Sequence, residues 1–257
     1  MARALTAAGH AVIGVSRQSA SQLSSADIHS VPDLTDINAL AAAFSGCDII
    51  FHFADRADRK SYARKDIGAA ADVLKAIRTA AMQNGISRIV AFSSVYANRP
   101  ESANDRYGRS KRAMEAVGLA PAPGVPAIIF RLPPLYGPGA RGAVRHIARA
   151  IENGWPLPFS LARAPRRFLS LDDLADLCAH VTDLDNVTFD RGVGNIWVPV
   201  ARKSGSLAAV SHAIGGQRTR LLPVPGIDRL LGGYLPRGQL ERDQDELVKA
   251  IGWRSPG

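Results

Sequence analysis

Short apolar runs alternate with helical segments along the first half of the chain, and this alternation constrains the fold more than any other feature. Four runs have the length of buried strands, at residues 11–16, 48–53, 88–93 and 127–131. Segments with helical periodicity lie between them, at residues 36–44, 67–83 and 107–117. Strands joined by helices are typical of a parallel sheet covered on both faces. We therefore expect an α/β fold with a doubly wound parallel sheet.

The pattern loosens after Tyr136-Gly137-Pro138-Gly139. Helices are predicted at residues 143–153, from Leu171 onward and at residues 243–251, with a short strand at residues 195–199. We expect a Rossmann-type domain over residues 1–138, to which later segments return, and a smaller C-terminal lobe mainly over residues 139–257. A chain of 257 residues, 46% of them hydrophobic, can bury a core of that size.

Composition excludes several classes of protein. No run approaches the roughly 20 apolar residues of a membrane span, and the first residues do not resemble a secretory signal, so we expect a cytoplasmic protein without membrane contact. The two cysteines, Cys47 and Cys178, lie in apolar stretches and are expected as free thiols. The six histidines show no ligand spacing, which predicts no metal site.

The net charge of +9 permits two interpretations. Basic proteins often bind nucleic acid. Aromatic residues, however, make up only 6% of this chain, and no helix-turn-helix or zinc pattern accompanies the charge. We favour an arginine-rich surface with a few arginines directed at an anionic ligand, and no nucleic acid partner.

Tyr107 and Lys111 are the first candidates for chemistry. Their spacing puts both on one face of the predicted helix. A phenol with a pKa near 10 is a poor base at neutral pH unless a cation stabilises the phenolate, which a lysine one turn away can do. Ser94 ends the preceding strand, where a hydroxyl points into the ligand crevice of such folds. Each feature alone also fits an ordinary surface helix or loop.

The order of several sequence blocks supports a chemical role for these three residues. They are Asp33-Leu34-Thr35-Asp36, residues 48–54, residues 88–94, Tyr107 to Lys111, residues 131–139 and residues 166–175. Together these blocks resemble the extended short-chain dehydrogenase/reductase family, in its NAD-dependent epimerase/dehydratase branch. The UDP-sugar 4-epimerase-like group is the most similar.

The resemblance implies a role for each candidate residue. Tyr107 would be the general acid and base, Lys111 would favour its phenolate and bind the nicotinamide ribose, and Ser94 would orient the reacting oxygen. Further residues would contact the cofactor, namely Arg17, Asp33, Leu34, Ala54, Pro133 and Leu135. Arg166, helped by Arg167, would hold the diphosphate of a nucleotide sugar, although a solvated basic loop is the alternative.

Three departures from the family pattern affect these expectations. The Gly-x-x-Gly-x-x-Gly turn that binds pyrophosphate is not found, and residues 2–9 match the end of the first family helix. We therefore expect a sheet without its first strand, through a misassigned start or a truncated product. Asp66 stands where the family usually has asparagine. Ser16-Arg17, rather than an acid, ends the second family strand, which leaves NAD and NADP both open.

These observations lead to one principal function and two alternatives. The principal one is an NAD(P)-dependent epimerase or dehydratase that acts on a nucleotide-activated sugar by transient hydride transfer. The alternatives are an NAD(P)H-dependent reductase or dehydrogenase of the same family, and a truncated, non-catalytic binding protein. The resemblance also implies a homodimer formed through the helix at residues 67–83 and the helix that carries Tyr107.

Overall fold

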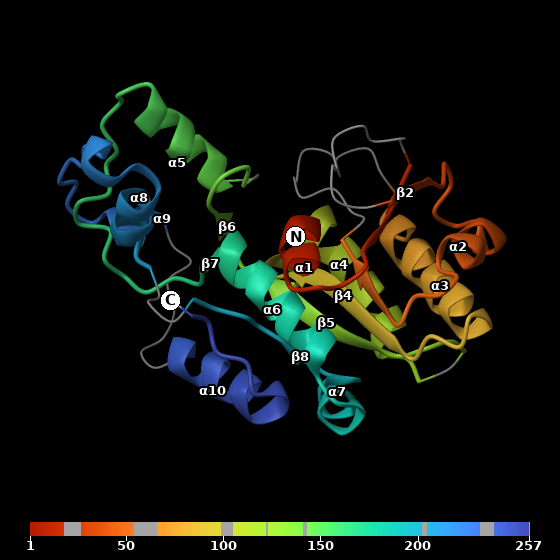
Figure 1. Ribbon diagram of the computed structural model, residues 1–257. Helices are drawn as coiled ribbons and strands as arrows, with labels where there is room; N and C mark the ends of the chain where they lie inside the picture. Colours follow the sequence, from red (N-terminus) through yellow and green to blue (C-terminus); the bar gives the residue numbers. More distant parts are fainter. Residues whose placement is uncertain are drawn as a thin grey trace. The chain divides into compact units, whose positions relative to one another are not determined.

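The computed structural model describes residues 1–17, 27–53, 66–98, 105–121, 123–140, 143–201, 205–231 and 239–256 (Figure 1). The chain forms two compact units. Unit 1 consists of Met1–Leu132 and Ala175–Trp197, and unit 2 consists of Pro133–Leu174 and Val198–Gly257. The chain therefore leaves unit 1 after its fifth strand and returns to it for one later segment. The expectation that the N-terminal domain binds the cofactor and the C-terminal lobe binds the substrate stays a prediction.

The strands of unit 1 are all parallel, which confirms the α/β class. One two-stranded sheet pairs β1 (Ile13–Ser16) with β2 (Asp27–Ser30). A four-stranded sheet has the order β3 (Ile49–His52), β4 (Arg88–Ser94), β5 (Ala127–Leu132) and β8 (Ile196–Trp197). Within the described ranges, no ladder joins these two sheets. The expectation that the sheet lacks the first strand of the family remains a prediction.

The helices of unit 1 begin and end where local chemistry favours it. They are α1 (Ala2–Ala7), α2 (Ile37–Ala43), α3 (Ala69–Gln83), α4 (Arg106–Leu119), the second part of α6 (Leu171–Asp183) and α7 (Asn186–Gly192). Side chains of Asp36, Asp105 and Asp185 accept N–H groups of the first turns of α2, α4 and α7. α3 ends at Gln83, as expected, with Asn84 as its C-cap, and Gly85 follows with a φ of 69°.

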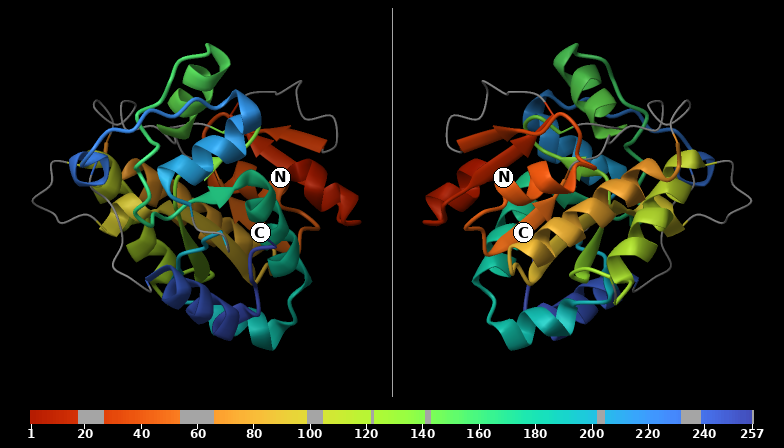
Figure 2. Two further views of the ribbon diagram at one scale, coloured as in Figure 1. Left: turned by 90° about the vertical axis from the view of Figure 1, so that its left-hand side faces the viewer. Right: turned by 90° about the vertical axis from the view of Figure 1, so that its right-hand side faces the viewer.

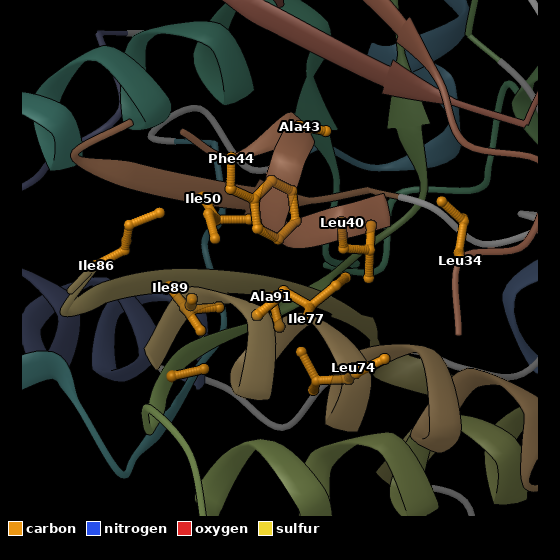
Figure 3. Close-up of a cluster of buried hydrophobic side chains, with 14 of the residues drawn as sticks. Leu34, Leu40, Ala43, Phe44, Ile50, Leu74, Ile77, Ile86, Ile89 and Ala91 are labelled. Atoms are coloured by element: carbon orange, nitrogen blue, oxygen red, sulfur yellow. The ribbon is translucent and has the colours of Figure 1, made fainter. Parts of the chain in front are cut away.

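One hydrophobic core joins three helices to the four-stranded sheet (Figure 3). Its helix residues include Leu40 of α2, Leu74 and Ile77 of α3 and Met114 of α4, and Phe44 at the C-cap of α2 joins them. Alternate strand residues meet them, namely Ile50, Ile89, Ala91, Ala127 and Ile129. The intervening residues Val90, Phe92, Ile128 and Phe130 are also buried. Both faces of the central strands are therefore covered, as is usual for parallel sheets.

Unit 2 is built from short elements around two small apolar clusters. Its elements are β6 (Leu135–Tyr136), α5 (Ala143–Glu152), β7 (Leu169–Ser170), the start of α6, α8 (Leu207–Gly215), η3 (Gly216–Arg218), α9 (Ile227–Leu231) and α10 (Gln239–Ile251) (Figure 2). One cluster contains Val144, Phe168 and Val210. The other contains Ile147, Ile151 and Leu157. Elements this short carry little periodicity, which explains why the sequence predicted only α5, α6 and α10 here.

Three further properties concern protein classes considered from the sequence. Among the described helices, none has the length and hydrophobicity needed to cross a membrane. Cys178 is buried and Cys47 is partly exposed, and both are free thiols. Over the same described ranges, no group of three or more histidine, cysteine, aspartate or glutamate side chains could hold a metal ion.

Candidate functional site

Helix α4 brings Tyr107 and Lys111 together at its first two turns. Both side chains are largely buried, with 8% and 4% of their surfaces exposed. The Lys111 ammonium donates a hydrogen bond of 3.2 Å to the carbonyl oxygen of Phe92 in β4. It also lies 5.9 Å from the centroid of the Tyr107 ring. The four-residue spacing thus places the cation beside the phenol ring and ties it to the strand that ends in Ser94.

A short 3-10 helix, η2 (Val95–Asn98), connects Ser94 to this pair. The Ser94 hydroxyl accepts the backbone N–H of Tyr96 at 3.4 Å. The Tyr96 ring stands edge-on to Tyr107, with centroids 5.8 Å apart and an interplanar angle of 68°. Ser94 is itself buried. Tyr96, which the sequence did not single out, therefore contacts both the predicted serine and the predicted tyrosine.

A second polar cluster, which sequence reasoning missed, lies on the same helix. The buried Glu115 carboxylate accepts the Ser93 hydroxyl at 2.5 Å. It also accepts two hydrogen bonds from Arg131, Nε to Oε1 at 2.7 Å and Nη2 to Oε2 at 2.6 Å. The signal available was that Glu115 follows Lys111 by four residues, so that both occupy one helix face. The strand residues that meet Glu115 could not be recognised from spacing.

The residues predicted to bind the adenine side of the cofactor follow the strands of the two-stranded sheet of β1 and β2. Arg17 is exposed directly after β1. Asp33 accepts the Thr35 N–H at 2.9 Å and the Thr35 hydroxyl at 2.7 Å, and these bonds lower the pKa of its carboxyl group. The Leu34 side chain is packed in the hydrophobic core, so only its backbone could approach a ligand. Ala54 lies outside the described residues.

The remaining predicted residues belong to unit 2. Pro133 is buried, and Leu135 pairs with Leu169 between β6 and β7. Arg166 forms an ion pair of 3.3 Å with Asp228. Arg167 forms a shorter pair of 2.6 Å with Asp243, which is buried on α10. Neither aspartate was singled out by the sequence, because each is distant from its arginine along the chain.

Asp66, the departure noted near the start of α3, is exposed. Its Oδ1 accepts the Gly68 N–H at 3.0 Å. The carboxylate therefore closes a local turn before α3, a bond that asparagine could also make.

Parallel strands covered by helices, with a Tyr-x-x-x-Lys helix packed on the strand that ends in serine, define a Rossmann-type short-chain dehydrogenase/reductase architecture. The sequence profile described as "NAD dependent epimerase/dehydratase family" matches residues 1–192, and the chain belongs to this family. The description specifies NAD, one of the two cofactors that the sequence left open. No curated protein sequence matches the chain.

Solved structures share the fold at low sequence identity. UDP-glucose 4-epimerase from Thermotoga maritima, solved with UDP-glucose, has a TM-score of 0.70 and 16% identity, covering 99% of this chain and 90% of that one. TunA, an NAD-dependent NDP-hexosamine 5,6-dehydratase of tunicamycin biosynthesis, has a TM-score of 0.70 and 20% identity, covering 100% and 88%. WbmG from Bordetella bronchiseptica, solved with NAD and UDP, has a TM-score of 0.66 and 18% identity, covering 99% and 85%.

Proposed function

We propose that this protein is an NAD-dependent epimerase or dehydratase that acts on a nucleotide-activated sugar through Tyr107, Lys111 and Ser94. The observation that carries the proposal is the position of the Lys111 ammonium, 5.9 Å from the Tyr107 ring and hydrogen-bonded to Phe92, two residues before Ser94. A buried cation beside the phenol ring supports a proton-transfer role for Tyr107.

The described residues could contact a nicotinamide dinucleotide both at a ribose and at its adenine. A lysine ammonium has three donors; Lys111 donates to the Phe92 carbonyl and would also donate to ribose hydroxyls. Asp33 follows β2 at the strand end where an adenine binds in parallel folds of this kind. When bound, the dinucleotide supplies the hydride acceptor and donor. Unit 1 would then hold the cofactor and unit 2 the substrate.

The protein's own residues would perform the proton chemistry. Tyr107 would remove the proton of the sugar hydroxyl at the carbon that is oxidised, and would return it when that carbon is reduced. Ser94 would donate a hydrogen bond to the same oxygen and hold it near the phenol. Lys111 would keep the charge of Tyr107 balanced during both transfers. In an epimerase the hydride is returned to the sugar, so the cofactor is not consumed overall. A reductase, in contrast, consumes the cofactor.

The arginines of unit 2 suggest the substrate class. A guanidinium can bind a diphosphate with two hydrogen bonds. Arg166 is the better candidate because its pair with Asp228 is longer, at 3.3 Å, than the 2.6 Å pair of Arg167 with Asp243. Two structural neighbours were solved with UDP-glucose or with NAD and UDP, which supports a nucleotide sugar here. Arg167 would mainly support the position of Arg166.

A panel of UDP- and dTDP-sugars tests the proposal. Purified protein supplied with NAD should convert at least one sugar without net change in NADH absorbance. Tyr107→Phe should lower kcat by about 100-fold or more while NAD binding is retained. Lys111→Met should impair turnover, whereas Lys75→Met, at an exposed position on α3, should not.

The other outcomes of this panel identify the alternatives. Stoichiometric consumption of NADPH or NADH would identify a reductase. A failure to turn over any sugar, combined with no calorimetric binding of NAD or NADP, would favour the truncated, non-catalytic binding protein. Turnover that survives Tyr107→Phe would overturn the assignment of the base.

A further inference from the structure

The Ser93, Glu115 and Arg131 cluster is not part of the chemistry proposed above, yet it joins α4, which carries Tyr107 and Lys111, to β4, which ends in Ser94. We propose that Glu115 and Arg131 are positioning residues, which set the place of α4 on β4 and β5 and so hold Tyr107 and Lys111 beside Ser94. The proposal rests on the proposed function, because it concerns the same site. It assigns a role to two residues that touch no reacting atom.

The strand ladder explains why one carboxylate can reach both strands. Ser93 and Arg131 are direct partners in the parallel pairing of β4 with β5. Ser93 lies on the same face of β4 as Ile89 and Ala91, and Arg131 lies on the same face of β5 as Ala127 and Ile129, which pack in the core against the helices. The Glu115 carboxylate descends from α4 onto that pair.

The contact with Arg131 is directional as well as attractive. Two parallel N–H···O bonds fix the orientation of a carboxylate, whereas a lysine at the same place would provide a point charge. Both partners are shielded from water, with side-chain exposures of 19% for Arg131 and 4% for Glu115. Apolar packing between a helix and a sheet tolerates small sliding movements. A buried bidentate pair does not, because sliding would leave charges unpaired.

The same cluster also holds the connection between Ser94 and Tyr107. Arg131 donates a further hydrogen bond to Asn98 at the end of η2. Arg112 donates to the Ala97 carbonyl at 2.9 Å. η2 carries Tyr96, whose ring contacts Tyr107. Loss of Arg131 would therefore loosen both α4 and the turn that follows Ser94.

Distance separates this role from direct catalysis. Glu115 follows Tyr107 by eight residues on one helix, which corresponds to about 12 Å along the axis. Glu115 contacts Ser93, which directly precedes Ser94. Lys111 contacts Phe92, which directly precedes Ser93. Successive turns of α4 thus contact successive residues of β4. A shift of α4 on this strand would move the phenol relative to the serine.

Four variants test the proposal in the full chain. Glu115→Ala removes all contacts of the carboxylate, and Glu115→Gln keeps the side-chain shape and its hydrogen-bonding oxygen. Arg131→Lys keeps the charge without the two-point contact. Arg88→Met is the matched control, because Arg88 is bonded to Leu184 and Asn186 at the opposite end of β4. Folding of each variant is checked by its thermal transition.

We expect Glu115→Ala and Arg131→Lys to lower kcat per cofactor-loaded site by roughly 10- to 100-fold while KM changes by less than about threefold, because the geometry of the reacting groups is lost rather than substrate binding. Glu115→Gln should recover a large part of kcat. Arg88→Met should lower the thermal transition and leave kcat unchanged. Equal kcat values in all four folded variants would overturn the proposal, as would loss of activity in Arg88→Met to the same extent.

A readout without turnover separates this proposal from the proposed function. Tyrosine labelled with ¹³C at Cζ gives one resonance per phenol, and Tyr107→Phe assigns the signal of Tyr107. Glu115→Ala and Arg131→Lys should shift or broaden that signal, and Arg88→Met should leave it in place. If no sugar is converted but the signal still responds in this way, the proposed function fails and the positioning role stands. An unaltered Tyr107 signal in the Glu115 and Arg131 variants would exclude the positioning role.

Discussion

The carbonyl oxygen of Tyr96 lies 2.5 Å from the point where a Cβ atom on Gly108 would stand. No side chain can occupy that space unless the backbone of η2 moves away from α4. Gly108→Ala should therefore destabilise the protein by about 1–2 kcal/mol, the usual cost of overpacking less the small helix-forming gain of alanine. It should also lower activity, because η2 follows Ser94. Urea denaturation and steady-state kinetics measure both effects.

Gly118 supplies the control for this prediction within the same helix. A Cβ there would meet only the ends of two side chains, Ile129 Cδ1 at 2.9 Å and Leu74 Cδ2 at 3.2 Å. Such atoms can move by rotamer adjustment, so Gly118→Ala should change stability by less than about 1 kcal/mol and leave kcat intact. If the two substitutions had equal effects, the close approach of η2 would not be the reason for glycine.

Arg78 of α3 secures the other end of α4. Its guanidinium is buried and donates hydrogen bonds to carbonyl oxygens at the end of α4 and in the loop that follows, at Val117, Ala120, Gly124 and Val125. Arg78→Met would leave these acceptors without their donor in a buried place. We expect a loss of roughly 3–5 kcal/mol in the free energy of unfolding, measured by chemical denaturation. Lys75→Met, on the exposed face of the same helix, should cost less than about 0.5 kcal/mol.

The ion pair of Arg167 with Asp243 should support the structure of unit 2. Removal of Arg167 alone leaves the buried Asp243 carboxylate without its guanidinium, and Arg167→Met should cost about 2–4 kcal/mol. The double variant Arg167→Met, Asp243→Leu should be more stable than the sum of the single effects predicts. Thermal unfolding of the wild type, the two single variants and the double variant gives the complete double-mutant cycle. Additive effects would mean that the two residues do not interact in solution.

The Cys178 thiol should make stability fall at alkaline pH. Burial raises its pKa from the ordinary value of 9.0 to about 12. Between these values the thiol loses its proton in the unfolded chain but keeps it in the folded protein, so a rise in pH favours unfolding. This contribution reaches about 1.4 kcal/mol for each pH unit. The stability difference between the wild type and Cys178→Ala should therefore shrink by about 2–3 kcal/mol from pH 9 to pH 11.

Much of unit 1 could be predicted because its signals are local. The aspartate before α2, the Asn84-Gly85 end of α3 and the apolar runs of β3, β4 and β5 each act over a few residues, and the structure contains each of these elements. β2 and the short elements of unit 2 were missed. A two-residue strand or a five-residue helix has no periodicity of its own and forms only because its neighbours pack against it.

Part of the candidate site could likewise be predicted from local sequence, and part depends on the tertiary structure. Tyr107 and Lys111 could be chosen because one helix carries both, and a spacing of four residues implies proximity. The family resemblance implied a diphosphate role for Arg166, helped by Arg167, and the structure adds the 2.6 Å ion pair of Arg167 with Asp243. The positions of Asp228 and Asp243 relative to the two arginines depend on how unit 2 folds, which no short-range pattern encodes.

The order of strands and helices, and the pairing of a phenol with an ammonium on one helix, follow from the amino-acid sequence, because both depend on residues a few positions apart. The meeting of Glu115 with Ser93 and Arg131 was decided only by tertiary structure. Those three residues come from a helix and two strands, and they converge because parallel pairing of β4 with β5 puts Ser93 and Arg131 side by side beneath α4. Burial of the Glu115 carboxylate then makes the charge pair obligatory, since a carboxylate cannot remain unpaired away from water.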